Sequence, residues 1–326
     1  MIVLKFGGTS LESAEAIERV AWIVRSRLPR HPAVVVSAHG KATNNLLALA
    51  KEAAEGHRDR AVETFNALEA YHSSLGASVV SEHDRRGMNS FLDCHFRELF
   101  NLIGRLPGSG KLSAQAEAEV TSFGERLSSG IMAFALRKAG INSAHLDSRV
   151  LVRTDVCTDD RHTEASPLMD ESCAKIRRAI FSLSKDTVPV LGGFIGSTPA
   201  GVTTTLGRNS SNLTAVLVAA AVDAKEVEIW TDVDGVYAHD PRLVSDQAPV
   251  ETLSFQEATE MAAHGAKVFH EGAVRLAQQE NIAVWIKNSR RPEIRGTVVA
   301  SHETVTPKPS VKEFFPQAVA AESGVA

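Results

Sequence analysis

Two patterns of apolar residues divide the chain. Short runs of consecutive apolar residues alternate with longer segments in which an apolar residue recurs every three or four positions. Residues 2–6, 33–37 and 188–191 are such runs, and their continuous, β-branched character predicts strands buried on both faces. An apolar stripe over residues 17–24, with Ser10 as its expected N-cap, predicts a helix after the first strand. The order strand, helix, strand, helix indicates a parallel sheet covered by helices.

The rest of the chain shows the same two patterns of apolar residues. Helical spacing runs through residues 53–106, and one long helix is expected from about residue 114 to residue 139. Further helices are expected near residues 168–183, 215–221 and 254–264, and further strands near residues 143–146, 150–152, 202–205, 227–230, 283–287 and 296–299. Residues 305–326 lose the periodicity, which predicts a loosely held tail.

A polar segment separates the strand at residues 202–205 from the helix at residues 215–221. Ser210, Ser211 or Asn212 is expected to cap this helix, because each side chain can accept a bond from an unpaired amide. A helix start with free N–H groups and Arg208 beside it is a natural anion site. An ordinary capped loop is the alternative interpretation.

Composition narrows the class of protein. The chain has 326 residues, of which 44% are hydrophobic and 23% charged, as in soluble globular proteins. Its net charge is 35 − 39 = −4, which gives no electrostatic reason to expect nucleic acid or an anionic membrane as a partner. Cys94, Cys157 and Cys173 are scattered and odd in number, which favours a reducing compartment. Without a leader pattern or an apolar run of about 18 residues, the chain is expected to be soluble and cytoplasmic.

Glycine-marked loops follow four of the expected strands, at residues 7–8, 40, 192–196 and 207. The carboxyl ends of parallel strands converge on the ligand crevice of an open α/β sheet, and glycine lets a ligand approach the backbone closely. None of the four matches the P-loop or the GxGxxG pattern, so phosphate binding would use another architecture. The alternative is that these glycines only serve tight turns.

Charged residues lie near these loops. Lys5, inside an apolar strand, is either an edge lysine that reaches solvent or a phosphate contact that offsets charge in phosphoryl transfer. Lys267 is a second such candidate, with an ordinary surface lysine as the alternative. The segment of residues 231–242 carries three aspartates and is either an acidic turn or a nucleotide loop that places carboxylates near magnesium-bound phosphate.

These residues together resemble the aspartate kinases of the amino acid kinase family. The resemblance rests on motifs in family order and at family spacing. They are Lys5-Phe6-Gly7-Gly8-Thr9-Ser10, residues 34–38 with Thr43-Asn44, residues 122–127, 193–196, 205–208 and 231–242, Gly265-Ala266-Lys267-Val268 with His270, and Gly296-Thr297. The match spans about residues 1–300.

The resemblance implies an α/β fold, an αβα sandwich with a mainly parallel central sheet. It implies an amino acid-binding lobe at residues 1–200, an ATP-binding lobe at residues 201–302 and a flexible tail at residues 303–326. Many aspartate kinases continue into ACT regulatory domains, and the chain is expected to be a short form without them. A homodimer is one possible assembly.

The resemblance also implies residue roles. Lys5 would contact the phosphates, Glu125 the substrate's amino group and Arg208 its α-carboxylate through a bidentate fork. The remaining amino acid pocket would consist of Ser37, Ala38, Thr43 and Ser211. The nucleotide would be surrounded by Gly7, Gly8, Thr231, Asp232, Tyr237, Asp240, Arg242 and Lys267, with Lys5, Lys267 and Asn212 at catalytic positions. ATP and Mg²⁺ are the expected cofactors, without a metal site built by the protein alone.

Two loops depart from the family pattern. Aspartate kinases usually read Gly-Arg-Gly-Gly-Ser-Asp, with a catalytic final aspartate, where residues 207–212 place Asn209, Ser210 and Asn212. Asn212 keeps the size but loses the charge and adds a donor. His39 and Lys41 replace a methionine and a glycine beside the expected amino acid pocket. They fit either a different anionic substrate or side chains that face solvent.

The implied reaction is the phosphorylation of the side-chain carboxylate of L-aspartate by MgATP to 4-phospho-L-aspartate. A carboxylate is already ionised at pH 7, so the reaction needs no general base and depends on positioning and charge neutralisation. Two alternatives stay open. One is a kinase for another amino acid carboxylate in a specialised biosynthetic pathway, and the other is a catalytically impaired kinase-like subunit, which the loss of charge at Asn212 supports.

Overall fold

The computed structural model of the chain describes residues 1–106, 108, 110–155, 160–237, 248–264 and 269–301. The strands are β1 (Ile2–Phe6), β2 (Pro32–Val36), β3 (Ser143–Leu146), β4 (Val188–Gly192), β5 (Ile195–Ser197), β6 (Thr203–Thr205), β7 (Glu226–Thr231), β8 (Thr252–Ser254), β9 (Ala283–Asn288) and β10 (Thr297–Ala300). The helices are α1 (Ala14–Arg27), α2 (Ala42–Ala54), α3 (Arg58–Val79), α4 (Arg85–Ile103), α5 (Ala114–Thr121), α6 (Phe123–Lys138), α7 (Ser148–Leu151), α8 (Met169–Phe181), α9 (Ser211–Ala221), α10 (Phe255–Ala263) and α11 (Glu271–Gln279), with 3-10 turns η1 (Gly8–Ser10) and η2 (Leu28–Arg30).

Eight strands form one central sheet in the order β3-β4-β2-β1-β7-β9-β10-β8. Neighbouring strands run parallel except β10, which is antiparallel to β9. The short strands β5 and β6 pair separately as an antiparallel hairpin. The mainly parallel sheet expected from the sequence is therefore confirmed.

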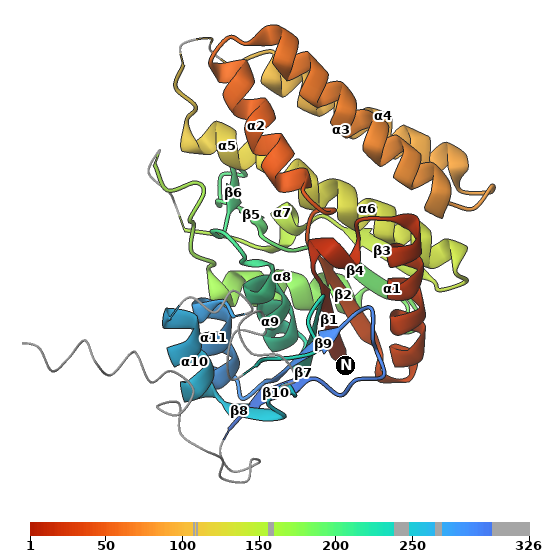
Figure 1. Ribbon diagram of the computed structural model, residues 1–326, viewed down its shortest axis with the longest axis vertical. Helices are drawn as coiled ribbons and strands as arrows, with labels where there is room; N and C mark the ends of the chain where they lie inside the picture. The colour runs from red at the N-terminus through yellow and green to blue at the C-terminus, as the bar shows by residue number, and fades with distance from the viewer. Residues whose placement is uncertain (107, 109, 156–159, 238–247, 265–268, 302–326) are drawn as a thin grey trace, which may run out of the picture.

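Helices cover both faces of this sheet, which explains why most side chains of its central strands are buried and apolar (Figure 1). Successive side chains of a strand point to opposite faces. Leu4 of β1 thus belongs to a core shared with α1, α2, α3, α4 and α6. Its neighbour Val3 belongs to a second core shared with α8, α9, α10 and α11. The result is the αβα sandwich that the family resemblance implies.

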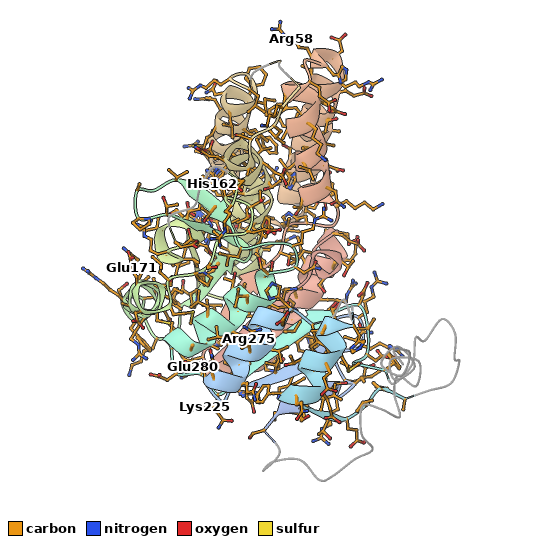
Figure 2. The ribbon with its side chains drawn as sticks, turned by 90° about the vertical axis from the view of Figure 1, so that its left-hand side faces the viewer. Arg58, His162, Glu171, Lys225, Arg275 and Glu280 are labelled. Carbon is orange, nitrogen blue, oxygen red and sulfur yellow. The ribbon has the colours of Figure 1, made fainter. Side chains whose placement is uncertain are left out.

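A layer of long helices, α2, α3 and α4, rises beyond the carboxyl ends of the strands (Figure 1). Figure 2 shows how far this helical layer extends from the sheet: Arg58 at the start of α3 and Lys225 before β7 lie at opposite ends of the molecule. No helix among the described residues is long and apolar enough to cross a membrane.

Three local predictions were wrong. The expected helix over residues 114–139 is divided at Ser122 into α5 and α6. Residues 150–152 do not form a strand, because Asp147 accepts from the Arg149 amide and caps the short helix α7. Ser10 does not cap α1, and the cap is Ser13. Residues 305–326 lie outside the described residues.

Candidate active site

A cavity of about 610 Å³ opens at the carboxyl ends of β1, β2 and β7, where side-by-side parallel strands deliver their loops. Eleven of the residues expected at the site line it together. They are Lys5, Gly7, Gly8, Ser37, Ala38, Thr43, Glu125, Arg208, Ser211, Asn212 and Thr231. Residues separated by more than 200 positions in the sequence thus meet in one place.

Lys5 and Glu125 form the electrostatic centre of the cavity. Burial lowers the pKa of Lys5 to about 8, against the opposing influence of the Glu125 charge. Burial likewise raises the pKa of Glu125 to about 8, although the Ala38 amide and Lys5 favour its charged form. Desolvation outweighs the mutual attraction in both groups. The pair can therefore change protonation near neutral pH when a charged ligand enters.

Glu125 is held by one oxygen and leaves the other free. Its Oε1 accepts from the Ala38 amide at 3.1 Å, while Oε2 is buried and has no hydrogen-bond partner among the described residues. A Cβ on Gly192 would lie 3.0 Å from the Glu125 backbone oxygen, so β4 and α6 approach each other closely. Because a buried carboxylate oxygen needs a donor, Oε2 is suited to a ligand's ammonium group.

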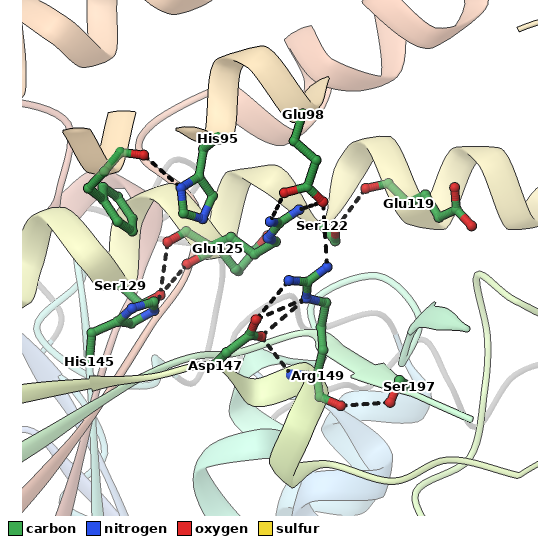
Figure 3. A network of polar contacts seen from close by, with 12 residues as sticks. His95, Glu98, Glu119, Ser122, Glu125, Ser129, His145, Asp147, Arg149 and Ser197 are labelled. Carbon is green, nitrogen blue, oxygen red and sulfur yellow. Dashed lines mark hydrogen bonds and ion pairs between the residues drawn. The ribbon is translucent and has the colours of Figure 1, made fainter. Parts of the chain in front are cut away.

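A polar network behind Glu125 fixes the start of α6 (Figure 3). Arg126 is buried and forms an ion pair with Glu98 of α4, and Arg149 pairs with both Glu98 and Asp147. Ser129 donates to the Glu125 carbonyl at 2.7 Å. This network connects α4, α6 and α7, so the backbone that carries Glu125 is fixed independently of any ligand.

The segment before α9 brings Arg208 to the wall of the same cavity. Gly207 and Asn209 both have left-handed φ values, 86° and 62°, a conformation that asparagine tolerates better than other residues with side chains. Ser210 occupies the N-cap position, but its side chain makes no capping bond, contrary to the expected cap. The positive end of the α9 dipole therefore lies beside Arg208, and both features favour an anion.

Two glycine positions are required by close backbone approach. A Cβ on Gly8 would lie 2.8 Å from the Ala38 carbonyl oxygen, and one on Gly193 would lie 2.5 Å from the Ser211 Cβ. Both distances are shorter than side-chain contacts allow. Glycine at these places lets the loops after β1, β2 and β4 meet around the cavity.

The loop after β7 is tied to the end of β9. The Thr231 carbonyl accepts from the Ser289 amide at 2.8 Å, and the Ser289 hydroxyl reaches Ser10 of η1 at 2.7 Å. Asp234 accepts from Asn288 at 2.7 Å and forms an ion pair with Arg291. Asp234 was not predicted as a site residue. These bonds connect the expected nucleotide loop to the first glycine loop.

The remaining predicted residues divide into two groups. Asp232 is exposed and Tyr237 half-buried, and neither lines the cavity, so their nucleotide contacts stay predictions. Asp240, Arg242 and Lys267 lie outside the described residues.

The two substituted positions of the loop after β2 have different surroundings. Lys41 lines the cavity, but His39 is fully buried beside a neighbouring cavity bounded by α2 and α3. The expectation that His39 faces either the amino acid pocket or solvent was therefore wrong.

Sequence reasoning assigned no site role to several residues of the cavity wall. They are Asn44, Leu47, Glu117, Thr121, Thr163, Glu164, Phe194 and Thr205. Glu117 and Thr121 lie one helical turn apart on α5, a spacing that places both on one face, but only the position of α5 reveals that this face meets the cavity. Within the described ranges, no three metal-ligating side chains lie close enough to hold an ion.

Comparison with known proteins identifies the family. Residues 1–288 match the sequence pattern of the amino acid kinase family. The chain is 33% identical to the bifunctional aspartokinase/homoserine dehydrogenase of Haemophilus influenzae, over 92% of this chain and 36% of that protein. It is 33% identical to the lysine-sensitive aspartokinase 3 of Escherichia coli, over 92% of this chain and 64% of that protein.

A solved structure of E. coli aspartokinase III in complex with aspartate and ADP superposes with a TM-score of 0.84 and 31% identity, covering 95% of this chain and 66% of that one. The chain thus spans between about one third and two thirds of the length of these relatives. The family match over residues 1–288 and the identities to these relatives lead to one conclusion: the chain belongs to the amino acid kinase family.

Proposed function

We propose that the chain transfers the γ-phosphoryl group of MgATP to the side-chain carboxylate of L-aspartate, giving 4-phospho-L-aspartate and ADP. The observation that carries the proposal is the free, buried Oε2 of Glu125 in the same cavity as Lys5 and Arg208. An α-amino acid has one ammonium and one carboxylate at fixed separation, and Glu125 and Arg208 offer one complementary charge to each. The relatives whose names include aspartokinase support the same substrate.

The chemistry depends on positioning. The acceptor carboxylate is ionised at neutral pH and attacks the γ-phosphorus while the bond to the ADP oxygen breaks. Lys5 and the amides of α9 offset the negative charge that gathers on the transferred group. Magnesium bound with nucleotides takes most of its ligands from phosphate and water.

An acceptor screen tests the proposal. ADP release is measured with L-aspartate, L-glutamate and related amino acids, and the acyl phosphate is trapped with hydroxylamine as a hydroxamate. We expect release and hydroxamate formation that depend on L-aspartate and disappear in the Lys5→Met variant, which controls for contaminating kinases. Release without hydroxamate, or no release with any acceptor, would refute the proposed reaction.

A second candidate is a kinase for a different, more anionic amino acid carboxylate. Lys41 favours it, because this residue lines the cavity and no ion pair within the described part of the chain engages it. In the same screen, a Lys41→Gly variant separates the two. It should leave turnover of L-aspartate intact under the first proposal and remove the preference for the larger acceptor under the second.

A further inference from the structure

His39 is a buried side chain that the proposed reaction does not use. It has no exposed surface, and its ring lies 5.4 Å from that of His72 and 6.4 Å from that of Tyr71, both on α3. Ala38 and Gly40 have no side chain beyond Cβ. His39 is therefore the one long side chain of residues 38–40, and it packs into the layer of long helices.

The backbone around His39 builds the amino acid end of the cavity. On one side, the Ala38 amide donates to Glu125 at 3.1 Å. On the other side, the Gly40 amide donates to the Gly8 carbonyl at 3.0 Å. The His39 side chain thus connects the helical layer to the short backbone segment that orients Glu125 and the first glycine loop.

The contact between the two imidazoles suits neutral rings. Neither ring nitrogen of His39, nor Nε2 of His72, has a hydrogen-bond partner in the described part of the molecule. His72 Nδ1 donates to the Leu68 carbonyl at 2.8 Å, which leaves Nε2 without a proton. If His39 were protonated, its two N–H groups would carry a buried positive charge with no hydrogen-bond acceptor. Burying a charge without a partner costs so much free energy that the ring stays neutral instead.

The charged and titratable groups around His39 do not relieve that cost. Tyr71 and His72 face it from α3, and Glu12 and Lys41 line the adjoining cavity. The Tyr71 hydroxyl is engaged by the Glu12 carbonyl at 3.0 Å, and the Glu12 carboxylate pairs with Arg290 at 3.4 Å. Lys41 would repel a second positive charge.

We propose that His39 is a positioning residue for the acceptor site: its neutral ring, packed against His72, holds the backbone of residues 38–40 in the geometry that orients Glu125, and protonation of His39 releases it. The inference rests on the proposed function only where it names the acceptor as the ligand of Glu125. His39 is the group that takes the proton, because it belongs to the segment that opens, whereas His72 stays within its helix beside Phe96.

The pH at which release begins follows from the direction of the pKa shift. Burial lowers the pKa of His39 well below its ordinary 6.5, so the held form stays neutral while the open form takes a proton once the pH falls below 6.5. Each further pH unit then favours opening by up to about tenfold. Above that pH, protonation does not contribute to opening.

Hydrogen exchange of the amides of residues 36–41 tests the inference, with protection factors compared so that intrinsic rates cancel. At pH 7.5 we expect His39→Ala to lower protection at least tenfold, because the segment loses its anchor. His39→Met should stay within about threefold of wild type, because methionine fills irregular apolar gaps and cannot be protonated. His83→Met, at an exposed position, is the control for loss of a histidine.

The pH series is decisive even if His39→Ala does not fold. Between pH 7.5 and pH 5.5, wild type and His83→Met should lose about tenfold in protection and His39→Met should lose none. Equal losses in His39→Met and wild type would overturn the inference, as would unchanged protection in a folded His39→Ala. Calorimetric titration with L-aspartate should show at least fivefold weaker binding by His39→Ala and unchanged ATP binding. If wild type binds no aspartate, the proposed function fails while the exchange result stands.

Discussion

Glu125 combines three properties that rarely occur in one carboxyl group. It is buried, its pKa is raised to about 8 by desolvation, and one of its oxygens has no partner in the described structure. Burial therefore favours the protonated form of Glu125 near neutral pH. A ligand ammonium at Oε2 would supply the missing positive charge and bring the pKa back down. Ligand binding and proton release are coupled at this residue.

Proton release on aspartate binding is the first prediction. Calorimetric titration at pH 7 in buffers with different ionisation enthalpies should show close to one proton released for each aspartate bound. Release should vanish above about pH 9, where Glu125 is already ionised, and affinity should rise as the pH rises through 8. The Glu125→Gln variant should release no proton and bind more weakly. Equal release by wild type and this variant would assign the proton to another group.

Asn212 is the residue whose chemistry departs furthest from the family pattern. It lies in the first turn of α9, lines the cavity and is only 7% exposed. A carboxylate there is favoured by the helix N-terminus and would share the cavity with Lys5. We expect Asn212→Asp to raise kcat at least about tenfold, because one preorganised polar group commonly changes kcat by more than that.

A matched variant separates position from charge. Asn209→Asp adds the same charge to the same cavity wall, at an exposed position three residues earlier. Steady-state ADP release should show little change in its kcat. If Asn212→Asp leaves kcat unchanged or lowers it, the site works with asparagine, and a reduced activity can no longer be attributed to the missing carboxylate.

At the scale of elements, the meeting of β4 and α9 sets the geometry of the acceptor site. Gly193 follows β4 directly, and its α-carbon faces the start of α9 so closely that a Cβ would lie 2.5 Å from Ser211. Phe194, the next residue, donates its amide to Thr214 of α9 at 3.1 Å. Any displacement of α9 moves Arg208 and Asn212 together, because Asn212 lies in its first turn and Arg208 lies two residues before its N-cap Ser210.

Replacing Gly193 with alanine should therefore affect both stability and binding. We expect the melting temperature to fall by several degrees, since overpacking of this kind costs roughly 1–3 kcal/mol, and the KM for aspartate to rise more than that for ATP. Gly87→Ala is the control. Gly87 lies inside α4, where alanine favours the helix, and the added Cβ would lie 3.4 Å from the Phe134 ring, an ordinary contact distance. A Gly193→Ala protein that melts and binds like wild type would show that α9 adjusts freely.

The elements that sequence reasoning predicted correctly are those with a regular hydrophobic pattern along their whole length. The strands β1, β2, β4 and β7 are rich in buried apolar residues because both faces of the sheet are covered. The errors occurred over short stretches that leave the hydrophobic pattern unchanged. Asp147 caps α7 within a β-branched stretch, and the apolar periodicity of residues 114–139 is divided at Ser122 between α5 and α6. Neither effect changes the hydrophobic period, so the pattern alone does not reveal it.

The site residues that lie at the ends of strands could be predicted from the sequence. Those that reach the cavity only through the packing of a helix could not. Lys5 and Thr231 are fixed by their positions in β1 and β7, and family motifs located Glu125 and Arg208. Glu117 of α5 carries no such signal, because its place in the cavity depends on how α5 lies against α2 and β6. The burial of His39 depends in the same way on α3, which no local pattern placed beside the loop after β2.

At the scale of the whole molecule, the division into residues 1–200 and 201–302 does not interrupt the sheet. β1 pairs with β2 on one side and with β7 on the other, so its hydrogen bonds join the two proposed lobes. The second core contains Val3 and Val35 as well as residues of α9, α10 and α11. Each lobe therefore needs the other to bury its apolar surface.

The described part of the chain should consequently unfold as one cooperative unit. Trp22 is 60% exposed on α1, whereas Trp230 of β7 is fully buried, so single-tryptophan variants report on the two lobes separately. We expect their thermal transitions to coincide, and aspartate or MgATP to raise both midpoints equally, because a ligand of the shared cavity stabilises the whole folded state. Wild-type calorimetry, with calorimetric and van't Hoff enthalpies in agreement, is the control against perturbation by the tryptophan replacements. If Trp22 reports a transition that aspartate shifts and Trp230 does not, the lobes are separate folding units, and the sheet pairing between β1 and β7 contributes little to their cohesion.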